Sequence, residues 1–406
     1  MDSGPPLDRV RQRAVEALDL ASAQRRERLD RVTRTAVRLV GADWAAVTVL
    51  DGDVVRLPST ACAPAGTPDQ APAEETFCQT TVRGEDLLAV EDAAADTRFD
   101  GLQLVTSGAV RAYAGVPLRD AAHNVVGVLC VFDQRPRAFT DEDRAALLDL
   151  RHWAESELTS ASEMAAARRV QTSMLPSTGV LAAGWDIGGM CLPSAAVGGD
   201  FFDHEVLHDT ADLVLGDVMG KGTGAALLGA SVRSAVRGAR RAVVAGVDLG
   251  VSTTQIARAM AEDLERAQSF VTLMQAVIDL EDGSTRVVDV GLGLGLVVRS
   301  AGGVERLGGT GLPMGVLADD HWEERETELG AGDRLVLVSD GVLDVLDEPG
   351  RSDWWVEVGQ WVRRADDVDA LIDHVRGRVA RGVPTDDVTV LAAFRGGPGP
   401  ADQGAA

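Results

Sequence analysis

The 406-residue sequence lacks any run of about 18 apolar residues, so no membrane-spanning helix is expected. Its first stretch, Met1 to Asp30, is charged and holds no apolar segment, so it does not read as a signal peptide. Cysteine is scarce and forms no Cys-x-x-Cys pair, which favours a reducing compartment over a disulfide scaffold. The cysteines are Cys62, Cys78, Cys130 and Cys191. These absences predict a cytoplasmic protein.

Positive charge is also scarce. The chain has 39 Lys and Arg against 63 Asp and Glu, which gives a formal net charge of -24, and its one lysine is Lys221. Nucleic acid phosphates and anionic membrane surfaces repel such a chain, so we expect neither as a main partner. What is present is ordinary for globular domains, with 45% hydrophobic and 25% charged residues. The length fits two or three domains.

The N-terminal part predicts a mixed α and β domain over residues 23–158, after a flexible lead over 1–22. A helix is expected over Arg25–Val40, where apolar residues recur at helical spacing. The alternating stretch Trp44–Leu50 predicts a strand, and the Pro- and Ala-rich stretch Ala61–Ala73 predicts a loop. Two further strands are expected over Ala112–Leu118 and Val125–Phe132.

A long helix is predicted to follow this domain. Thr140 and Asp141 form a capping signal, and apolar residues then repeat at spacings of three and four until Met174, before Pro176. The linker is therefore assigned to residues 141–176. Such a helix is either a rigid spacer or the stalk of a parallel homodimer. The heptads carry Ala and Glu at the seam, so both interpretations stay open, with the dimer slightly favoured.

Strands dominate the C-terminal part, assigned to residues 177–395. Hairpins are expected across Asp282-Gly283 and across Ala301-Gly303, because glycine-rich turns there separate apolar runs. The remaining expected elements are a strand over Ala211–Leu215, a helix over Ala225–Arg240, a strand over Arg334–Val338, helices over Trp354–Arg364 and Val368–Arg381, and a strand over Val388–Phe394. The Gly- and Pro-rich tail, 396–406, is predicted to be disordered.

Acidic residues stand at the ends of predicted strands, each beside glycine or a turn. They are Asp200, Asp217, Asp340 and the pair Asp386 and Asp387. Any one of them alone is more often a simple turn residue. Several carboxylates converging on one place repel one another unless a cation holds them, and ligand sets made only of oxygen select Mg²⁺ or Mn²⁺.

The C-terminal part, from about Met174 to Phe394, resembles the metal-dependent protein phosphatase family (PPM, type 2C-like). The resemblance is greatest to its bacterial stage II sporulation protein E-like and RsbU-like group. The matching stretches are Ala167–Pro176, Val197–Asp203 (VGGDFFD), Gly216–Leu228 (GDVMGKGTGAALL), Phe270–Leu280, Ser339–Gly341 and Thr385–Val390. The resemblance implies a four-layer α-β-β-α sandwich, so that the whole chain is an α/β (α+β) two-domain protein joined by the long helix.

The same resemblance implies a site that holds two Mn²⁺ or Mg²⁺ ions. Asp217 would bridge both ions, with the carbonyl of Val218 as a further ligand. Asp200 would hold one ion, while Asp340 and Asp386 would hold the other. Asp387 is included as a ligand because it belongs to the same pair, and Asp203 is expected to be structural.

The implied reaction is the hydrolysis of phosphoserine or phosphothreonine by a water whose pKa the two ions lower. The substrate typical of the group is a phosphorylated anti-sigma-factor antagonist. Val290–Gly293 departs from the family, because relatives commonly read Asn-Ala-Gly-His there. This departure keeps a second hypothesis open, in which the domain is a weak or inactive phosphatase that only docks partners.

The N-terminal part resembles a GAF domain, a sensor fold that would regulate the enzyme. The resemblance rests on Ala45–Asp51, Glu75–Gln79, Leu88–Phe99, Tyr113–Leu118 and Gly127–Phe132. No cyclic-nucleotide signature is present, so the small ligand or protein that this domain binds stays unidentified. Cys78 is expected to be a buried core residue and not a redox anchor.

One motif is rejected. His204-Glu205-Val206-Leu207-His208 matches the HExxH pattern of zinc proteases, which requires a helix so that both histidines share one face. The segment predicts a strand instead, because it follows Phe201 and Phe202 in an alternating apolar pattern. A zinc protease is therefore not expected.

Overall fold

The structure is a computed structural model that describes residues 23–397 except 85, 121, 310, 318 and 383. The predicted lead over 1–22 and the tail from 398 lie outside the described residues. The chain divides into two compact units, Met1–Ala166 and Ala167–Ala406, and each is described by itself. No helix in the described ranges is long and apolar enough to cross a membrane.

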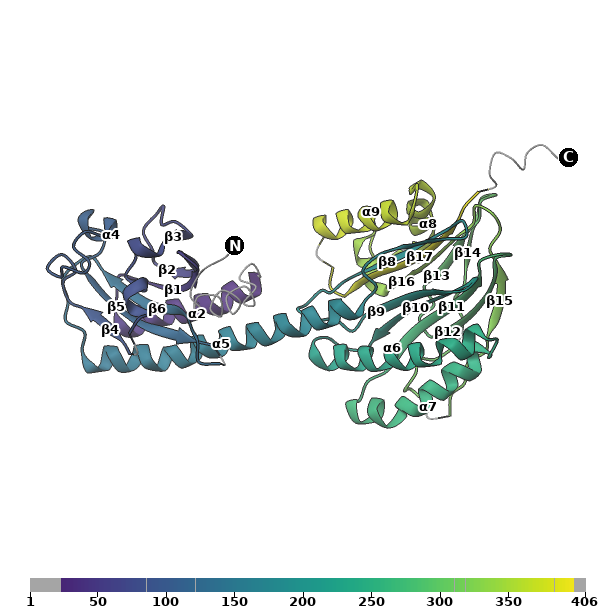
Figure 1. The fold of residues 1–406 in the computed structure, drawn as a ribbon, viewed down its shortest axis with the longest axis horizontal. Helices are drawn as coiled ribbons and strands as arrows, with labels where there is room; N and C mark the ends of the chain where they lie inside the picture. Colours follow the sequence, from purple (N-terminus) through teal and green to yellow (C-terminus); the bar gives the residue numbers. More distant parts are fainter. Residues whose placement is uncertain are drawn as a thin grey trace. The chain divides into compact units, whose positions relative to one another are not determined.

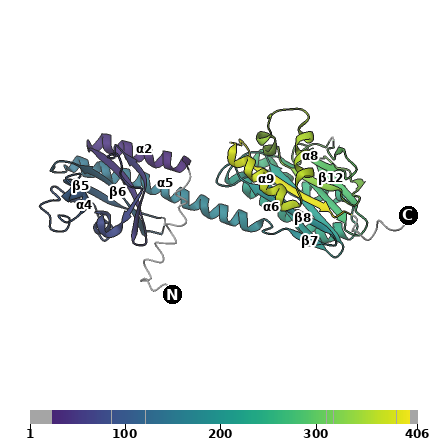
Figure 2. The ribbon, with the colours of Figure 1, turned by 90° about the horizontal axis from the view of Figure 1, so that it is seen from above.

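The first unit is built on one six-stranded antiparallel sheet with the strand order β3-β2-β1-β6-β5-β4. Helix α2 (Ala23–Val40) and the first part of α5 (Asp141–Met174) cover one face, and η1, α3 and α4 cover the other (Figures 1 and 2). The remaining elements are β1 (Trp44–Asp51), β2 (Val54–Ala61), β3 (Gln70–Pro72), η1 (Ala73–Glu75), α3 (Cys78–Thr81), β4 (Leu88–Val90), α4 (Gln103–Thr106), β5 (Ala112–Arg119) and β6 (Val125–Asp133).

The elements expected here are confirmed except at one place. The stretch predicted as a loop over Ala61–Ala73 contains the short strand β3, which pairs with β2 between Gln70 and Arg56 and between Pro72 and Val54. Strand β3 lies at the edge of the sheet, where proline is tolerated because its missing N–H faces no partner strand. The loop prediction was therefore wrong for these three residues.

The predicted linker helix is confirmed as α5. A reciprocal capping box begins it: the amide of Asp143 donates to Oγ1 of Thr140 at 3.2 Å, and the amide of Thr140 donates to Oδ2 of Asp143 at 2.9 Å. Leu147 and Leu158 are buried against the sheet of the first unit. Whether the helix also pairs two chains stays a prediction.

The second unit is a sandwich of two antiparallel sheets. One sheet has the order β15-β12-β11-β10-β9 and the other β14-β13-β16-β17-β8-β7. The strands are β7 (Val180–Ala182), β8 (Trp185–Leu192), β9 (Phe201–Leu207), β10 (Thr210–Val218), β11 (Val271–Asp279), β12 (Ser284–Val290), β13 (Gly295–Val298), β14 (Val304–Arg306), β15 (Arg325–Glu328), β16 (Arg334–Val338) and β17 (Val388–Arg395).

Helices cover both outer faces of this sandwich (Figure 1). One apolar cluster lies between the sheets, and a second and a third lie between each sheet and its helices. The helices are α6 (Thr223–Val244) and α7 (Leu249–Ala267) on the first sheet, with α8 (Trp354–Arg364) and α9 (Val368–Arg381) on the second; the short helix η2 (Asp340–Val345) follows β16. The four-layer α-β-β-α prediction is confirmed.

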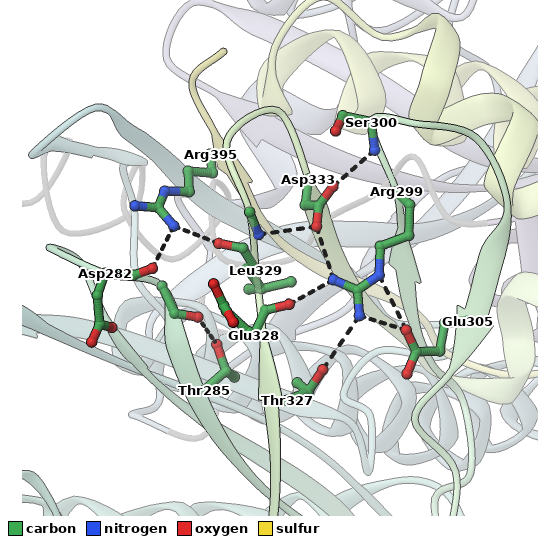
Figure 3. A network of polar contacts seen from close by, with 12 residues as sticks. Asp282, Thr285, Arg299, Ser300, Glu305, Thr327, Glu328, Leu329, Asp333 and Arg395 are labelled. Carbon is green, nitrogen blue, oxygen red and sulfur yellow. Dashed lines mark hydrogen bonds and ion pairs between the residues drawn. The ribbon is translucent and has the colours of Figure 1, made fainter. Parts of the chain in front are cut away.

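A polar network ties the two sheets together at one end of the sandwich (Figure 3). The guanidinium of Arg299, which follows β13, donates to Asp333 at 2.8 Å and to the carbonyl of Glu328 at the end of β15. Arg395, at the end of β17, donates to the carbonyls of Asp282 and Leu329. Because β17 runs away from Asp387 over eight residues, this network lies at the far end from the acidic loops.

Candidate metal centre

The predicted acidic residues come together where four strands of the sandwich, β9, β10, β16 and β17, begin or end. Asp217 is near the end of β10, and Asp200 directly precedes its partner β9. In the facing sheet, Asp340 opens η2 directly after β16, while Asp386 and Asp387 directly precede β17, the antiparallel partner of β16. The two pairs of strands therefore present their acidic ends at the same edge of the sandwich.

Two consecutive glycines allow the loops at this edge to approach closely. A Cβ atom on Gly198 would lie 2.1 Å from Oδ2 of Asp387, and one on Gly199 would lie 2.5 Å from the carbonyl oxygen of Val218. No side chain fits at either place without moving the acidic loop or the predicted carbonyl ligand. The sequence Val-Gly-Gly-Asp is thus required by the packing of the site.

Asp200 is buried and Asp217 is half-buried, and the two form the centre of the site. Burial, helped by the charge of Asp217, raises the pKa of Asp200 well above its usual range, although Thr389 donates a hydrogen bond to its Oδ2 at 2.5 Å. Burial, together with the charges of Asp340 and Asp386, raises the pKa of Asp217 to about 6. Neither carboxyl group therefore has enough positive charge nearby to stabilise its ionised form.

Asp340 and Asp386 form the outer part of the site. Burial and the charge of Asp386 raise the pKa of the Asp340 carboxyl. Nζ of Lys221 lies 3.3 Å from Oδ2 of Asp386 and also donates to the carbonyl of Thr385. Within the described part of the chain, Lys221 is the one basic side chain that forms an ion pair with these carboxylates.

The donor set fits hard divalent cations. The groups are carboxylate and carbonyl oxygens, and three of the carboxyl groups carry raised pKa values that a bound cation would relieve. Among the described residues, however, no three His, Cys, Asp or Glu side chains already surround a common point as a finished ion site. The side chains share one region and require small movements before they could share an ion.

Asp387 differs from the other acidic residues because both of its oxygens already have donors. Oδ1 accepts from the amide of Ser194 at 2.7 Å and from its hydroxyl at 3.1 Å. Oδ2 accepts from the amide of Gly199 at 2.8 Å and lies 3.4 Å from the amide of Asp200. The side chain is 3% exposed. This carboxylate holds the glycine loop in place, which disfavours the ligand role expected from the sequence.

Asp203 lies outside the site, as expected of a structural residue. It is buried, and its Oδ2 lies 3.3 Å from guanidinium nitrogens of three arginines on α6, Arg233, Arg237 and Arg240. Arg240 in turn pairs with Asp212 at 2.6 Å. These contacts fix the helix that follows the Gly216–Gly222 loop against β9 and β10.

The atypical loop Val290–Gly293 lies on the same sheet as Asp217, with Gly291 bridged to Leu273 of β11. Asp289 holds it from below, accepting from the amides of Leu292 at 2.9 Å and Gly293 at 3.0 Å. The backbone amides of the loop make these bonds to Asp289, and the residues of the loop offer no polar side chain.

The HExxH segment has the expected strand geometry. His204 lies on β9 and is buried, whereas His208 follows the end of the strand with a positive φ of 56°. The two side chains do not share a helix face, so the motif does not form the zinc site that it mimics.

Two residues that contribute to this region were not assigned a role from the sequence. The side-chain amide of Gln171, near the end of α5, donates to the carbonyl of Gly198 at 2.7 Å, and its Oε1 accepts from the amide of Gly198 at 3.1 Å. Lys221 is the other. Gln171 lies in the family-like stretch Ala167–Pro176, so that stretch carried a usable signal.

The raised pKa values predict how ions and protons compete. Folding raises the pKa of Asp217 from 3.8 to about 6. At a pH between these values, Asp217 is therefore protonated in the folded protein and ionised in the unfolded chain. The metal-free protein is therefore expected to lose stability as the pH rises through about 6. A divalent cation bound there would replace that proton, so the rise in melting temperature on adding Mn²⁺ should be larger at pH 8 than at pH 5.

Thermal melts at pH 5, 6, 7 and 8, with MnCl₂ or with EDTA, check this prediction. An ion at 100 times its Kd stabilises by about 2.7 kcal/mol. The variant Asp217→Asn serves as the control, since it should remove the part of the pH dependence that comes from Asp217. An equal Mn²⁺ effect at pH 5 and pH 8 would contradict the prediction.

Comparison with family models gives two matches. A model described as Stage II sporulation protein E (SpoIIE) matches residues 208–395, and a GAF domain model matches residues 24–158. Asp217, Asp340, Asp386 and Asp387 lie within the first match, while Asp200 precedes it.

Two curated proteins and one solved structure illustrate what this chain is similar to. The phosphoserine phosphatase RsbU of Bacillus subtilis is 24% identical over 193 residues, covering 47% of this chain and 56% of that protein. Protein IcfG of Synechocystis is 23% identical over 265 residues, covering 57% of this chain and 41% of its own length. Among solved structures, the SiaA-PP2C domain of Pseudomonas aeruginosa has a TM-score of 0.49 at 22% identity, covering 60% of this chain and 99% of that domain. The matches span about half the length of these two curated relatives.

Proposed function

Since the chain carries a GAF domain followed by a phosphatase domain of the SpoIIE and PP2C type, we propose that it is a GAF-regulated, metal-dependent protein serine/threonine phosphatase. The observation that carries the proposal is the gathering of Asp200, Asp217, Asp340 and Asp386 at one edge of the sandwich, with pKa values of the first three raised. Carboxylates that gather without matching cations repel one another, which is unfavourable in a purely structural role.

Phosphatases of this type are metal-dependent, and we propose Mn²⁺ or Mg²⁺, as two ions. Asp217 and the Val218 carbonyl would serve the centre, Asp200 the inner position, and Asp340 with Asp386 the outer one. When bound, these ions supply the positive charge that activates a water and neutralises the phosphoryl oxygens. Thr389 orients Asp200 through its hydrogen bond at 2.5 Å. We propose that Asp387 positions the Gly198-Gly199 backbone in place of the ligand role predicted from the sequence.

The proposed substrate is a phosphoserine or phosphothreonine on an anti-sigma-factor antagonist, as in partner-switching signalling. The similarity to a named phosphoserine phosphatase supports this class of substrate. We further propose a cytoplasmic location, which the four free cysteines support.

The proposed route of regulation is the end of α5. Gln171 clamps both backbone groups of Gly198, and Gly198 lies against Asp387. A shift of this helix end would therefore move the glycine loop that carries Asp200. Because small misplacements of reacting groups are costly, Gln171→Ala should lower phosphate release about tenfold.

Phosphate release by Gln171→Ala and Gln171→Glu tests this route. Glutamate can still accept from the Gly198 amide but cannot donate to its carbonyl, so its activity should be intermediate. Gln255→Ala, on the exposed face of α7, is the matched control and should behave as the wild type. Wild-type activity in Gln171→Ala would rule the clamp out of the mechanism.

The alternative hypothesis is a docking protein of low activity, with the GAF domain as its ligand sensor. The nonpolar loop Val290–Gly293, held by Asp289, favours it. Both hypotheses are separated by phosphate release from an aryl phosphate and from a phosphoserine protein, with and without Mn²⁺. Mn²⁺-dependent release supports the enzyme, whereas Mn²⁺ binding without release from either substrate supports docking.

A further inference from the structure

Two buried thiols of the GAF unit lie against the same face of one strand. Cys130, on β6, is paired with Ala46 of β1, and its thiol donates to the Ala46 carbonyl at 3.4 Å. Sγ of Cys78, at the start of α3, lies 3.3 Å from Oγ1 of Thr48. Ala46 and Thr48 are two residues apart on β1, so they share a face. Cys78, Cys130 and Ala46 belong to one buried cluster on this face of the sheet.

The two sulfur atoms differ in their access to small molecules. Cys78 lines a cavity of about 440 Å³, together with Trp44, Thr48 and Phe132. Cys130 is 0% exposed and is absent from the residues that line this cavity. A small molecule in the cavity therefore meets Cys78 and not Cys130.

The two thiols also differ in acidity. The hydrogen bond from Cys130 lowers the pKa of Cys78, and this effect outweighs its burial. Burial raises the pKa of Cys130 well above its usual range. The accessible sulfur is thus the one that more readily becomes a thiolate, and the hidden one keeps its proton. This is the asymmetry of an attacking and a resolving cysteine.

We propose that Cys78 and Cys130 form a reversible dithiol–disulfide site that reacts with small peroxides entering this cavity. The sequence predicted Cys78 to be a buried core residue and not a redox anchor. The structure confirms the burial, whereas the proposed redox role departs from the second half of that prediction, because the distance along the chain from Cys130 concealed the pair. The proposal is independent of the phosphatase reaction.

The chemistry balances with peroxide as the oxidant. The Cys78 thiol gives up its proton and attacks one peroxide oxygen as the thiolate. The O–O bond breaks, and the departing oxygen takes up that proton and leaves as water or an alcohol, giving a sulfenic acid on Cys78. The Cys130 sulfur then attacks the Cys78 sulfur, the S–O bond breaks, and the hydroxyl leaves as water with the Cys130 proton. Two electrons pass from the thiols to the peroxide, and an external dithiol reverses the step.

The test uses the full chain with hydrogen peroxide at a few equivalents, followed by alkylation and mass spectrometry. We expect a loss of about 2 Da, because two hydrogens leave, and a linked peptide pair containing Cys78 and Cys130, both reversed by dithiothreitol. Cys62, which is exposed, is the internal control, and Cys62→Ser should still form the link.

A variant distinguishes a closing pair from a single reactive thiol. In Cys130→Ser, dimedone should trap a sulfenic acid on Cys78 that it does not trap in the wild type. Two results would overturn the proposal. In the first, Cys78 and Cys130 of the unfolded, quenched wild type can both still be alkylated although Cys62 is oxidised. In the second, dimedone labels Cys78 of the wild type and no linked peptide forms. The wild-type result needs no variant, so a folding defect cannot obscure it.

Discussion

Asp217→Asn should lower Mn²⁺-dependent phosphate release by about 10²–10³-fold, the loss typical of removing one group that stabilises charge in a transition state. Burial and the charge of Asp340 raise the pKa of Asp217, and the charge of Asp217 helps burial to raise the pKa of Asp200, so Asp217 lies between the inner and outer carboxylates of the site. Asparagine keeps the size of the side chain and removes only its negative charge. The loss should therefore arise from weaker ion binding and not from a change in fold.

Two further measurements separate these causes. Mn²⁺ binding, followed by calorimetry, should weaken in Asp217→Asn. The melting temperature of the metal-free variant at pH 8 should equal or exceed that of the wild type, since one source of repulsion is gone. Asp263→Asn, an exposed aspartate on α7, should change neither quantity. A variant that keeps full Mn²⁺-dependent turnover would refute the assignment of Asp217.

Elements with strong local signals were predictable from the sequence. The structure has α5, α8 and α9 where they were expected, and for α5 the capping signal at Thr140 marks the start. Helix α7 is absent from the predicted elements, although Asp248 caps it by accepting from the Val251 amide at 2.8 Å. Its buried face is made mostly of small and polar residues near its start, which weakens the periodic pattern.

The acidic residues of the site could be named because each stands beside glycine at the end of a strand. Their separate roles could not, because those depend on contacts between loops far apart in the chain. Asp387 receives hydrogen bonds from Ser194, which follows the paired strand β8, and from Gly199, whose position depends on how the two sheets pack. Likewise, Gln171 meets Gly198 only after α5 has docked. Both contacts are products of tertiary packing, which no local pattern encodes.

Substitution by Asn should mainly lower the stability of the protein at Asp387, whereas at Asp386 it should mainly weaken ion binding. Asp387→Asn replaces an oxygen that accepts from backbone amides by an NH₂ group that faces them. Losing hydrogen bonds to a buried charged acceptor should lower the free energy of unfolding by about 3 kcal/mol. Asp386 is 43% exposed at its side chain and pairs with Lys221, so Asp386→Asn should change that free energy by less than about 1 kcal/mol.

Asp386→Asn should weaken Mn²⁺ binding more than Asp387→Asn does. Asp386→Asn removes a proposed ligand, and we expect Mn²⁺ affinity to fall about 10–100-fold, at least as much as when a residue that orients a ligand is lost. At a temperature where it is folded, Asp387→Asn should lose less Mn²⁺ affinity than Asp386→Asn. Urea unfolding in EDTA and Mn²⁺ calorimetry measure the two quantities on the same samples. If Asp387→Asn is as stable as the wild type but no longer binds Mn²⁺, Asp387 is a ligand, as the family resemblance implies, and the positioning role is wrong.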